Sequence, residues 1–492
     1  MSQHVPGNIF RQYDIRGIVE GERPELTLDL AEDIGRAYGS HIIARDGRKV
    51  VVGYDSRPSA PDYHDALVKG IAATGCDVHD IGAVPTPVVW FSIGRLGADG
   101  GAMVTASHKE QAYNGVKMRQ GQEPLVGDDI RALLCRIRKA DYAAGSGRIV
   151  REDTDEVLDA YVAGMVGAVE LERPLKVVVD LGRGIPSRTV PRALGLAGCE
   201  TRVVRDDWTG SFPEKPLDPA EPDRLDELCD LVRCGEADVG LAFDADGDRL
   251  GIVDESGIVV PPDIYVIPLC REILDGGPAK FVFDVRCSMA LIEDVTERGG
   301  DVIPSPCGYP SILANMARHN AALGAETTGH AFLAELTRAF DFVTAPYDDA
   351  LFAAMKFLQR LAATGGGATA LVEDVPRYHM SLDYRLSCPD AVKFDLVREV
   401  RDRMRAAGRD VNDIDGVRID MEGGWGLLRA SNTGPELTIK YEARTPALYR
   451  EIGEAIADEL SRFDGLPDEG IAHVRDLPKH PWCEAGGSGC SD

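Results

Sequence analysis

Three aspartates alternate with small residues in the segment FDADGDR, from Phe243 to Arg249. The apolar runs VGLAF and LGIV flank it, so we expect the segment to join two buried strands. In an extended backbone alternate side chains point to one side, and the carboxylates of Asp244, Asp246 and Asp248 would meet there. Close negative charges repel one another unless a cation joins them, and oxygen ligands alone favour a hard ion such as Mg²⁺. A solvent-exposed acidic turn is the alternative.

A second polar segment, TASHKEQAYNGVK, runs from Thr105 to Lys117 and places Ser107 beside His108. Taken alone, a Ser-His pair is more often an exposed loop than an active site. The aspartates change this interpretation, because three carboxylates fill part of an octahedral Mg²⁺ shell and leave room for another anionic oxygen. A phosphorylated Ser107 would supply that oxygen together with a transferable phosphoryl group. We therefore predict that Ser107 lies at the same metal site.

The chain repeats one pattern three times. The runs KVVVGYDSR, KVVVDLGRG and KFVFDVRCS begin at Lys49, Lys176 and Lys280, and each is typical of a buried parallel strand. A helical pattern and a second strand that starts with glycine follow each run, which makes a βαβ unit. The spacings of 127 residues (176 − 49) and 104 residues (280 − 176) are of domain size. We expect three similar mixed α/β domains with ligands at the carboxyl ends of their strands.

Beyond residue 372 the pattern changes. A polar amphipathic helix over 391–406 is flanked by strand-like segments such as GVRIDMEGGWGLLRASN and TIKYEA, which predicts a C-terminal α+β domain. The last segment, LPKHPWCEAGGSGCSD, is interpreted as a loose tail. The expected divisions are three α/β domains over 1–147, 148–256 and 257–372, an α+β domain over 373–465 and a tail over 466–492.

The composition is that of a globular protein, with 44% hydrophobic and 27% charged residues. A formal net charge of −27 argues against a nucleic-acid partner, because phosphate backbones are bound by clustered Lys and Arg. The sequence shows no signal peptide and no run of about 18 apolar residues, so we expect a cytoplasmic protein without a membrane partner. The eleven cysteines are scattered without a C-x-x-C pair, which indicates reduced thiols.

Taken together, these segments resemble the α-D-phosphohexomutase family, which includes phosphomannomutases, phosphoglucomutases and phosphoglucosamine mutases. The matching motifs follow the family order: FRQYDIRG from Phe10, TASH-x5-NG-x-K from Thr105, DADGDR from Asp244, AETTGH from Ala325 and RASNTGP from Arg429. The resemblance covers residues from about 8 to 463. It implies four domains around a central cleft, with a sugar-binding loop in the third domain and a phosphate-binding loop in the fourth.

The resemblance also implies a reaction. In the family, a phosphoserine gives its phosphoryl group to a hexose phosphate, and the resulting hexose 1,6-bisphosphate turns round and returns its other phosphoryl group to the serine. The net result is an intramolecular phosphoryl transfer between C6 and C1, which is an isomerisation. TASH and RASN favour mannose and glucose phosphates as the small-molecule substrates. Mg²⁺, one ion per active site, and a hexose 1,6-bisphosphate are the expected cofactor and activator, and the expected assembly is a monomer or a homodimer.

The motifs give each candidate residue a role by resemblance. Ser107 would carry the phosphoryl group and would ligate the metal together with Asp244, Asp246 and Asp248. Lys117 is the expected proton-transfer or charge-stabilising group, since desolvation can lower the pKa of a lysine toward neutrality; an ordinary surface lysine is the alternative. The remaining expected catalytic residues are Arg16, His108 and His330, and His330 taken alone would be interpreted as a structural histidine.

Substrate-binding roles follow from the same motifs. Glu326 and Thr328 would hold sugar hydroxyls, because a carboxylate and a hydroxyl offer several hydrogen bonds within a short span. A guanidinium with hydroxyl and amide donors suits a phosphate clamp, for which the candidates are Arg429, Ser431, Asn432 and Thr433. The other expected substrate-binding residues are Tyr13, Arg249, Arg286 and Tyr309.

Four places depart from the family pattern and leave the preferred sugar open. Lys109 and Glu110 stand where Asn-Pro is common, Arg286 replaces a frequent Lys, the segment 307–309 reads CGY where VGH is common, and Thr328 replaces the usual Ser. The alternatives are a phosphoglucosamine mutase, a metal-dependent sugar phosphatase in which water takes the phosphate, and a sugar-phosphate-binding homologue without turnover.

Overall fold

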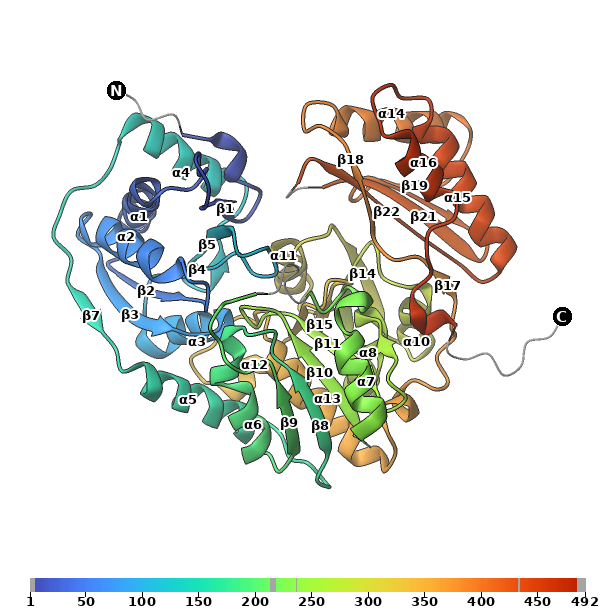
Figure 1. The fold of residues 1–492 in the computed structure, drawn as a ribbon, viewed down its shortest axis with the longest axis horizontal. Helices are drawn as coiled ribbons and strands as arrows, with labels where there is room; N and C mark the ends of the chain where they lie inside the picture. Colours follow the sequence, from blue (N-terminus) through green and yellow to red (C-terminus); the bar gives the residue numbers. More distant parts are fainter. Residues whose placement is uncertain (1–4, 213–217, 236, 432–433, 485–492) are drawn as a thin grey trace.

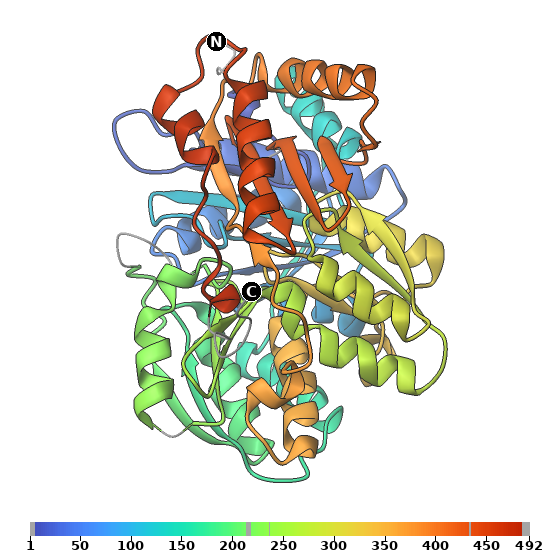
Figure 2. The same ribbon diagram turned by 90° about the vertical axis from the view of Figure 1, so that its right-hand side faces the viewer.

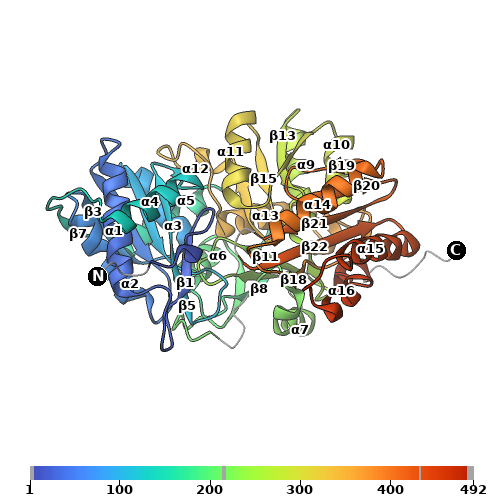
Figure 3. The ribbon, with the colours of Figure 1, turned by 90° about the horizontal axis from the view of Figure 1, so that it is seen from above.

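The computed structural model describes residues 5–212, 218–235, 237–431 and 434–484. Its strands form four sheets, one in each of the four domains that the sequence predicts. The first and fourth domains stand opposite each other above the second and third (Figure 1). Seen from above, the first and fourth domains occupy opposite ends of the molecule (Figure 3).

The first domain is built on a seven-stranded sheet with the order β1-β5-β4-β2-β3-β7, and β6 pairs with β5. Its strands are β1 (Ile15–Ile18), β2 (Lys49–Tyr54), β3 (Asp77–Ala83), β4 (Gly100–Val104), β5 (Tyr113–Gln120), β6 (Glu123–Pro124) and β7 (Ile149–Arg151). Its helices are α1 (Leu28–Ile43), α2 (Ala60–Ala72), α3 (Thr86–Leu96) and α4 (Asp128–Lys139). Helices cover both faces of the sheet, because Val50 and Val52 pack with α1, α2 and α4 while Val51 belongs to a second core with α3.

The second domain has a five-stranded sheet with the order β12-β11-β10-β8-β9. Its strands are β8 (Lys176–Asp180), β9 (Glu200–Val204), β10 (Val239–Phe243), β11 (Leu250–Asp254) and β12 (Val259–Val260). Its helices are α5 (Thr154–Gly167), α6 (Val190–Leu196) and α7 (Asp226–Gly235).

The third domain has a four-stranded sheet, in the order β14-β13-β15-β16. Its strands are β13 (Lys280–Asp284), β14 (Asp301–Ser305), β15 (Leu323–Ala325) and β16 (Ala331–Leu333), and its helices are α8 (Pro262–Tyr265), α9 (Ile267–Asp275), α10 (Met289–Glu297), α11 (Tyr309–His319), α12 (Leu336–Ala339) and α13 (Ala350–Thr364).

Two edge strands extend their sheets past the expected domain divisions. β7 pairs in parallel with β3 of the first sheet, although the sequence interpretation assigned residues from 148 onward to the second domain. β12 pairs with β11 of the second sheet, beyond the expected division at residue 256. Both strands are two or three residues long, so neither contains an apolar run that a sequence pattern could reveal.

The three α/β domains share one strand arrangement, which confirms the predicted repeat. The strands that begin at Lys49, Lys176 and Lys280 each pair in parallel with the next strand of their βαβ unit. On the other side each pairs in parallel with β4, β10 or β15, and an antiparallel strand follows in each case. The loops between these last two strands are therefore equivalent in the three domains. They span residues 105–112, 244–249 and 326–330.

The fourth domain contains an antiparallel sheet, which agrees with the predicted α+β domain. Its order is β17-β22-β21-β20-β19, and β18 also pairs with β22. Its strands are β17 (His379–Met380), β18 (Tyr384–Ser387), β19 (Val411–Asn412), β20 (Val417–Met421), β21 (Gly424–Ala430) and β22 (Glu436–Ala443). Its helices are α14 (Lys393–Ala406), α15 (Pro446–Leu460) and α16 (Asp468–Val474).

The interpretation of the C-terminal segment as a loose tail is wrong for the part that the structure describes. After α16 the chain continues to a short 3₁₀ helix, η5 (Pro481–Cys483). Leu477 and Trp482 are 2% and 1% exposed, so this segment is packed against the protein. The Gly- and Ser-rich composition that suggested a tail belongs to residues 485–492, which lie outside the described ranges.

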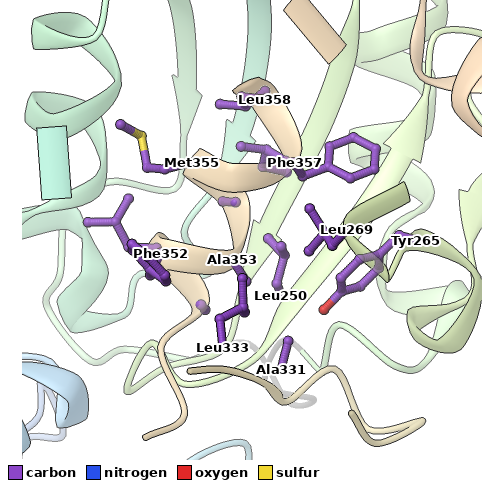
Figure 4. Close-up of a cluster of buried hydrophobic side chains, with 14 of the residues drawn as sticks. Leu250, Tyr265, Leu269, Ala331, Leu333, Phe352, Ala353, Met355, Phe357 and Leu358 are labelled. Carbon is purple, nitrogen blue, oxygen red and sulfur yellow. The ribbon is translucent and has the colours of Figure 1, made fainter. Parts of the chain in front are cut away.

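One continuous hydrophobic core joins the first three domains. It contains Trp90 from the first, Val179 from the second and Phe283 from the third. α13 passes through its middle, where Phe352 and Phe357 lie close to Leu250, Leu269 and Leu333 (Figure 4). The fourth domain has a separate core formed by α14, α15, α16 and its sheet.

The described residues also bear on two expectations, that of no membrane partner and that of reduced thiols. None of the helices in the described ranges has both the length and the apolarity needed to cross a membrane. The cysteines of the same ranges form no disulfides, and most of them are buried.

Candidate active site

The loop between β4 and β5 holds Ser107 in an unusual backbone conformation. Its φ is +52°, in the left-handed region that residues with a Cβ seldom adopt. The Ser107 backbone N–H donates to Thr105 Oγ1 (2.8 Å), and that hydroxyl donates to the carboxylate of Asp55 (2.7 Å). Ser107 Oγ lies 2.8 Å from Asp244 Oδ2 and 3.3 Å from His108 Nδ1. The structure therefore brings the serine, from the first domain, into contact with the aspartate loop of the second.

Arg57 holds the serine loop in place through hydrogen bonds to its backbone. Its guanidinium is buried and donates to four backbone carbonyls, those of Ser107, Lys109 and Glu110 in the loop and that of Tyr113 at the start of β5. Its Nε lies 3.3 Å from the Asp55 carboxylate. Burial raises the pKa of Asp55 to about 6, and the charge of Arg57 opposes this rise. The position of Ser107 thus depends on a buried ion pair that no sequence motif identified.

Replacing Arg57 with methionine is expected to lower the free energy of unfolding by about 3–5 kcal/mol, because Asp55 would be left as an uncompensated buried charge. Isomerisation activity should fall as well, since these four carbonyls lose their donor. Urea unfolding followed by circular dichroism would measure the change in stability. The matched control is Arg131→Met, because Arg131 forms an exposed ion pair with Asp128 and should contribute less than about 1 kcal/mol. Equal effects of the two variants would contradict the role given to Arg57.

The aspartate loop forms a tight turn, so the expectation of an extended segment is wrong. Asp244 Oδ1 accepts hydrogen bonds from the backbone N–H groups of Gly247, Asp248 and Arg249 at 3.1–3.2 Å. Gly247 has a φ of +79°, which a residue with a Cβ would adopt only with strain. The turn nevertheless gathers the carboxylates as predicted, because ligand atoms of Asp244, Asp246 and Asp248 all lie within 4.8 Å of one another.

The carboxylate cluster suits a hard divalent cation. All three aspartates are fully buried, and burial together with the charges of Asp248 and Asp246 raises the pKa of Asp244 well above its ordinary value. Among the residues that the structure describes, the buried Oδ1 atom of Asp246 has no hydrogen-bond partner. A buried carboxylate oxygen without a donor, beside two further carboxylates and the Ser107 hydroxyl, is the donor set that Mg²⁺ accepts.

Lys117 contacts the same cluster from β5. Its ammonium donates to Asp246 Oδ2 (2.7 Å) and to Asp248 Oδ2. Burial alone would lower the pKa of Lys117, but the charges of Asp246, Asp248 and Asp348 raise it well above the ordinary value. The expectation that desolvation would shift this lysine toward neutrality is therefore wrong. Lys117 is held as a cation in this arrangement.

The loop between β15 and β16 places the three residues of the predicted sugar-binding motif together. His330 Nδ1 lies 2.9 Å from Glu326 Oε2, and the hydroxyl of Thr328 is 3.1 Å from both groups. The Nε2 atom of His330 lies 3.3 Å from Asp248 Oδ1, which links this loop to the aspartate loop. Burial opposes the charged form, but Asp248 and Glu326 raise the pKa of His330 to about 10. His330 is therefore cationic at neutral pH.

The fourth domain supplies the predicted phosphate loop between β21 and β22. Arg429 Nε donates to Asp415 Oδ2 (2.9 Å), and the same oxygen accepts from the backbone N–H of Cys307 in the third domain (3.0 Å). Ser431 Oγ accepts from the backbone N–H of Gly434 (3.1 Å). Asn432 and Thr433 lie outside the described residues.

Several of the other predicted residues are held by carboxylates around the cleft. Arg16 pairs with Asp14 at 2.8 Å, and Arg249 lies 3.4 Å from Asp218. Arg286 joins two domains, because it contacts Asp284 at 2.6 Å and Asp383 at 2.8 Å. The rings of Tyr13 and Tyr309 meet edge to face with centroids 5.1 Å apart.

Burial and the charges of Arg249 and Arg16 hold the pKa of His108 well below its ordinary value, so this imidazole is neutral.

These loops meet at one cleft with a volume of about 390 Å³. The predicted site residues that line it are Tyr13, Arg16, Ser107, His108, Lys117, Arg249, Arg286, Tyr309, Glu326, Thr328, His330, Arg429 and Ser431. Asp244, Asp246 and Asp248 are buried beside Ser107, through the contact of its hydroxyl with Asp244. Every predicted site residue within the described ranges is thus at the cleft or in direct contact with a residue that lines it.

The four domains match the domains of a known protein family. Residues 7–143, 159–257 and 261–378 match the alpha/beta/alpha domains I, II and III of phosphoglucomutase/phosphomannomutase, and residues 385–459 match its C-terminal domain. The chain belongs to this family. Its reaction class is accordingly that of a hexose phosphate mutase, which is an isomerase.

Individual members of the phosphoglucomutase/phosphomannomutase family are similar over most of their length. A phosphomannomutase/phosphoglucomutase of Pseudomonas putida is 34% identical over 461 residues, which cover 94% of this chain and 97% of that protein. A phosphoglucomutase of Neisseria gonorrhoeae is 32% identical and covers 91% of this chain and 95% of its own. The crystal structure of a phosphoglucomutase/phosphomannomutase family protein of Burkholderia thailandensis superimposes with a TM-score of 0.83 at 33% identity, covering 97% of this chain and all of that one.

Sequence reasoning missed several residues at the site of this family member. Thr86, at the start of α3, donates to Asp246 Oδ2 (2.7 Å), and Arg119 lies 3.2 Å from the buried Asp348 beside His330. Lys440 and His480 line the cleft from the fourth domain and the C-terminal segment. A signal was available for Arg57, because the first and third repeats both carry Asp-x-Arg where their first strand ends, and both form an ion pair there. The other residues carry no motif that could have identified them.

Proposed function

We propose that this chain interconverts the 6-phosphates and 1-phosphates of mannose and glucose, with Ser107 as the phosphoryl carrier. The observation that carries the proposal is the 2.8 Å contact between Ser107 Oγ and Asp244, which joins a strained serine loop to a buried carboxylate cluster. The names of the relatives, which include phosphomannomutase/phosphoglucomutase and phosphoglucomutase, support these two sugars.

The donor set described above supports one Mg²⁺ ion held by Asp244, Asp246, Asp248 and Ser107. Such an ion, when bound, neutralises charge on a phosphoryl group in transfer. Lys117 and His330, both cationic, add positive charge on the same side of the cleft. Arg16 and Arg249 line the cleft near the serine and can bind phosphate oxygens. Most of the catalytic assistance in this site is therefore electrostatic.

His108 is the group best placed to exchange a proton with the serine oxygen. It lies 3.3 Å from Ser107 Oγ, and its lowered pKa leaves the imidazole able to accept a proton. In the half-reaction that returns a phosphoryl group to the serine, the Ser107 hydroxyl attacks the phosphorus of the bisphosphate and passes its proton to His108, while the bond from phosphorus to the sugar oxygen breaks and that oxygen takes up a proton; the opposite half-reaction runs these transfers in reverse. Lys117 and His330 lie farther from this step, because they contact Asp246 and Asp248 rather than the serine oxygen.

The sugar and the second phosphate would be held by the loops of the third and fourth domains. Glu326 and Thr328 offer a carboxylate and a hydroxyl to sugar hydroxyls, and Tyr13, Tyr309 and Arg286 form the adjoining walls. Arg429 and Ser431 would clamp the phosphate that is not transferred, together with Asn432 and Thr433. A hexose 1,6-bisphosphate would serve as the intermediate and as the activator that phosphorylates Ser107.

Phosphorus NMR tests the proposal directly. Mannose 1-phosphate, glucose 1-phosphate and glucosamine 1-phosphate would be incubated separately with the protein, Mg²⁺ and a trace of hexose 1,6-bisphosphate. We expect the 6-phosphates of mannose and glucose to appear without inorganic phosphate. Release of inorganic phosphate would instead identify a phosphatase, and conversion of glucosamine 1-phosphate alone would assign a different sugar.

A further inference from the structure

The C-terminal segment over 477–484 lies beyond residue 459, where the match to the family's C-terminal domain ends. It returns from α16 toward the second domain (Figure 2) and is fastened along its length. The backbone N–H of His480 donates to the carbonyl of Met380 (2.9 Å), and the carbonyl of Trp482 accepts from Arg377 Nη1 (3.0 Å). The Trp482 ring joins the core of the first three domains, and the Arg377 guanidinium stacks 3.8 Å above it. The segment is therefore an ordered part of the active-site wall.

His480 is the residue of this segment that reaches the cleft. It lines the cleft although its side chain is only 5% exposed. Its Nδ1 atom accepts a hydrogen bond from the backbone N–H of Trp482 (3.2 Å), so a neutral ring carries its proton on Nε2. Burial and the neighbouring charge of Lys440 lower the pKa of His480 to about 3, which keeps the ring neutral. Within the described residues, no acceptor forms a hydrogen bond with the Nε2–H group.

Lys440 presents a second donor to the cleft, with only a long ion pair to Asp383. This lysine is 5% exposed, lines the cleft and has no hydrogen bond among the residues that the structure describes. Its nearest carboxylate, that of Asp383, lies 3.6 Å away and accepts a closer contact from Arg286 at 2.8 Å. Both residues line the cleft and have no hydrogen-bond acceptor for these donors among the described residues, so the donors are available to an oxygen-rich ligand that enters it.

The neighbouring residues indicate which oxygen the two donors would meet. Lys440 lies two residues along β22 from Thr438, which also lines the cleft and pairs with Arg429 on β21. Lys440 therefore lies on the same face of the sheet as Arg429, two residues further along, and an ammonium at that place favours an anionic oxygen over a hydroxyl. A neutral imidazole N–H beside the ammonium adds a directed donor without adding further charge.

We propose that His480 binds substrate, donating its Nε2–H to a phosphate oxygen of the sugar phosphate in the cleft, next to Lys440. This inference rests on the proposed function, because it needs a sugar phosphate as the ligand. It assigns a substrate contact to a C-terminal segment that lies outside the four matched domains of the family. The active site is then completed by residues that follow the last matched domain.

Two substitutions of His480 separate a substrate contact from a structural role. In His480→Asn, the side-chain oxygen can still accept from the Trp482 backbone N–H, but the donor toward the cleft is lost. In His480→Gln, the longer amide keeps a donor near the position of Nε2. The matched control is His473→Ala, because His473 is exposed on α16 and lies in the same terminal region.

The proposal is tested by calorimetric titration of the full chain with glucose 1-phosphate and with mannose 1-phosphate. The values of kcat and KM and the melting temperature are measured for the same variants. We expect His480→Asn to raise Kd and KM roughly tenfold without a change in melting temperature, and His480→Gln to recover most of the affinity. The proposal is overturned if His480→Asn binds like the unaltered chain, or if both variants weaken binding equally while the melting temperature falls. Binding without isomerisation by the unaltered chain would refute the proposed function, and the comparison of Kd values would still decide the role of His480.

Discussion

Replacing Ser107 with alanine is expected to lower isomerisation by roughly four orders of magnitude or more, because the variant has no oxygen atom to carry the phosphoryl group. The backbone of the loop should persist, since it is held by Arg57 and by Thr105 and not by the serine hydroxyl. The rate of conversion of glucose 1-phosphate would be followed by phosphorus NMR. Intact-mass measurement after incubation with hexose 1,6-bisphosphate would show whether a phosphoryl group is added.

The control for this experiment is Ser461→Ala, because Ser461 follows α15 on an exposed surface and bonds to the carbonyl of Asp458. It should retain full activity and still acquire the phosphoryl group on Ser107. Binding of Mg²⁺ by Ser107→Ala should remain measurable, since the three aspartates are unchanged. Turnover by Ser107→Ala comparable to that of the unaltered chain would remove Ser107 from its proposed role.

Removing divalent cations with a chelator is expected to reduce isomerisation by roughly a hundredfold or more, and added Mg²⁺ should restore it. The reason is the buried cluster of Asp244, Asp246 and Asp248, whose negative charge would otherwise oppose an incoming phosphate. Loss of a metal ion that stabilises a phosphoryl group raises the activation free energy by several kcal/mol. Each 1.36 kcal/mol corresponds to a tenfold change in rate. Elemental analysis of the protein before and after chelation would measure the metal content.

The substitution Asp246→Asn tests the same site without a chelator. It removes one charge while keeping the size of the side chain, so the concentration of Mg²⁺ needed for half-maximal activity should rise. The control is Asp301→Asn, because Asp301 lies on the exposed edge strand β14 and should not affect the metal. An enzyme that stays fully active after chelation with no residual metal would refute the metal site.

The sequence was sufficient to predict the repeat and the meeting of distant motifs. Buried parallel strands have a strong apolar signature, and their carboxyl ends share one edge of a sheet. This is why the segments around Ser107, Asp244 and Glu326 could be expected to face one cleft, and the structure places all three there. The family resemblance then assigned roles that spacing alone could not.

Other features could not be predicted because they depend on backbone groups or on tertiary neighbours. The repeated Asp-x-Arg could have pointed to Arg57, but its contact with the serine loop is made through carbonyl oxygens, which every residue has. Alternating aspartates suggested an extended segment, but Asp244 instead accepts three backbone N–H groups and closes a turn. The charge state of Lys117 follows from Asp246, Asp248 and Asp348, and the last of these lies in a segment without a motif. The order of the terminal segment with His480 could not be expected, because the Gly- and Ser-rich residues that follow it give the whole segment the pattern of a tail.

The continuous core beneath the first three domains divides the active site into a fixed part and an adjustable part. The loops with Ser107, Asp244 and Glu326 are anchored to sheets that share this core, so their mutual distances are set when the protein folds. The loop with Arg429 is carried by a domain that has its own core. In the proposed reaction the clamp would have to accept a phosphate from either end of the bisphosphate, while the other three loops stay at fixed distances from one another. The chain enters the fourth domain at β17, and the C-terminal segment is fastened to the same place, so it ties the carrier of the Arg429 loop to the rest of the molecule.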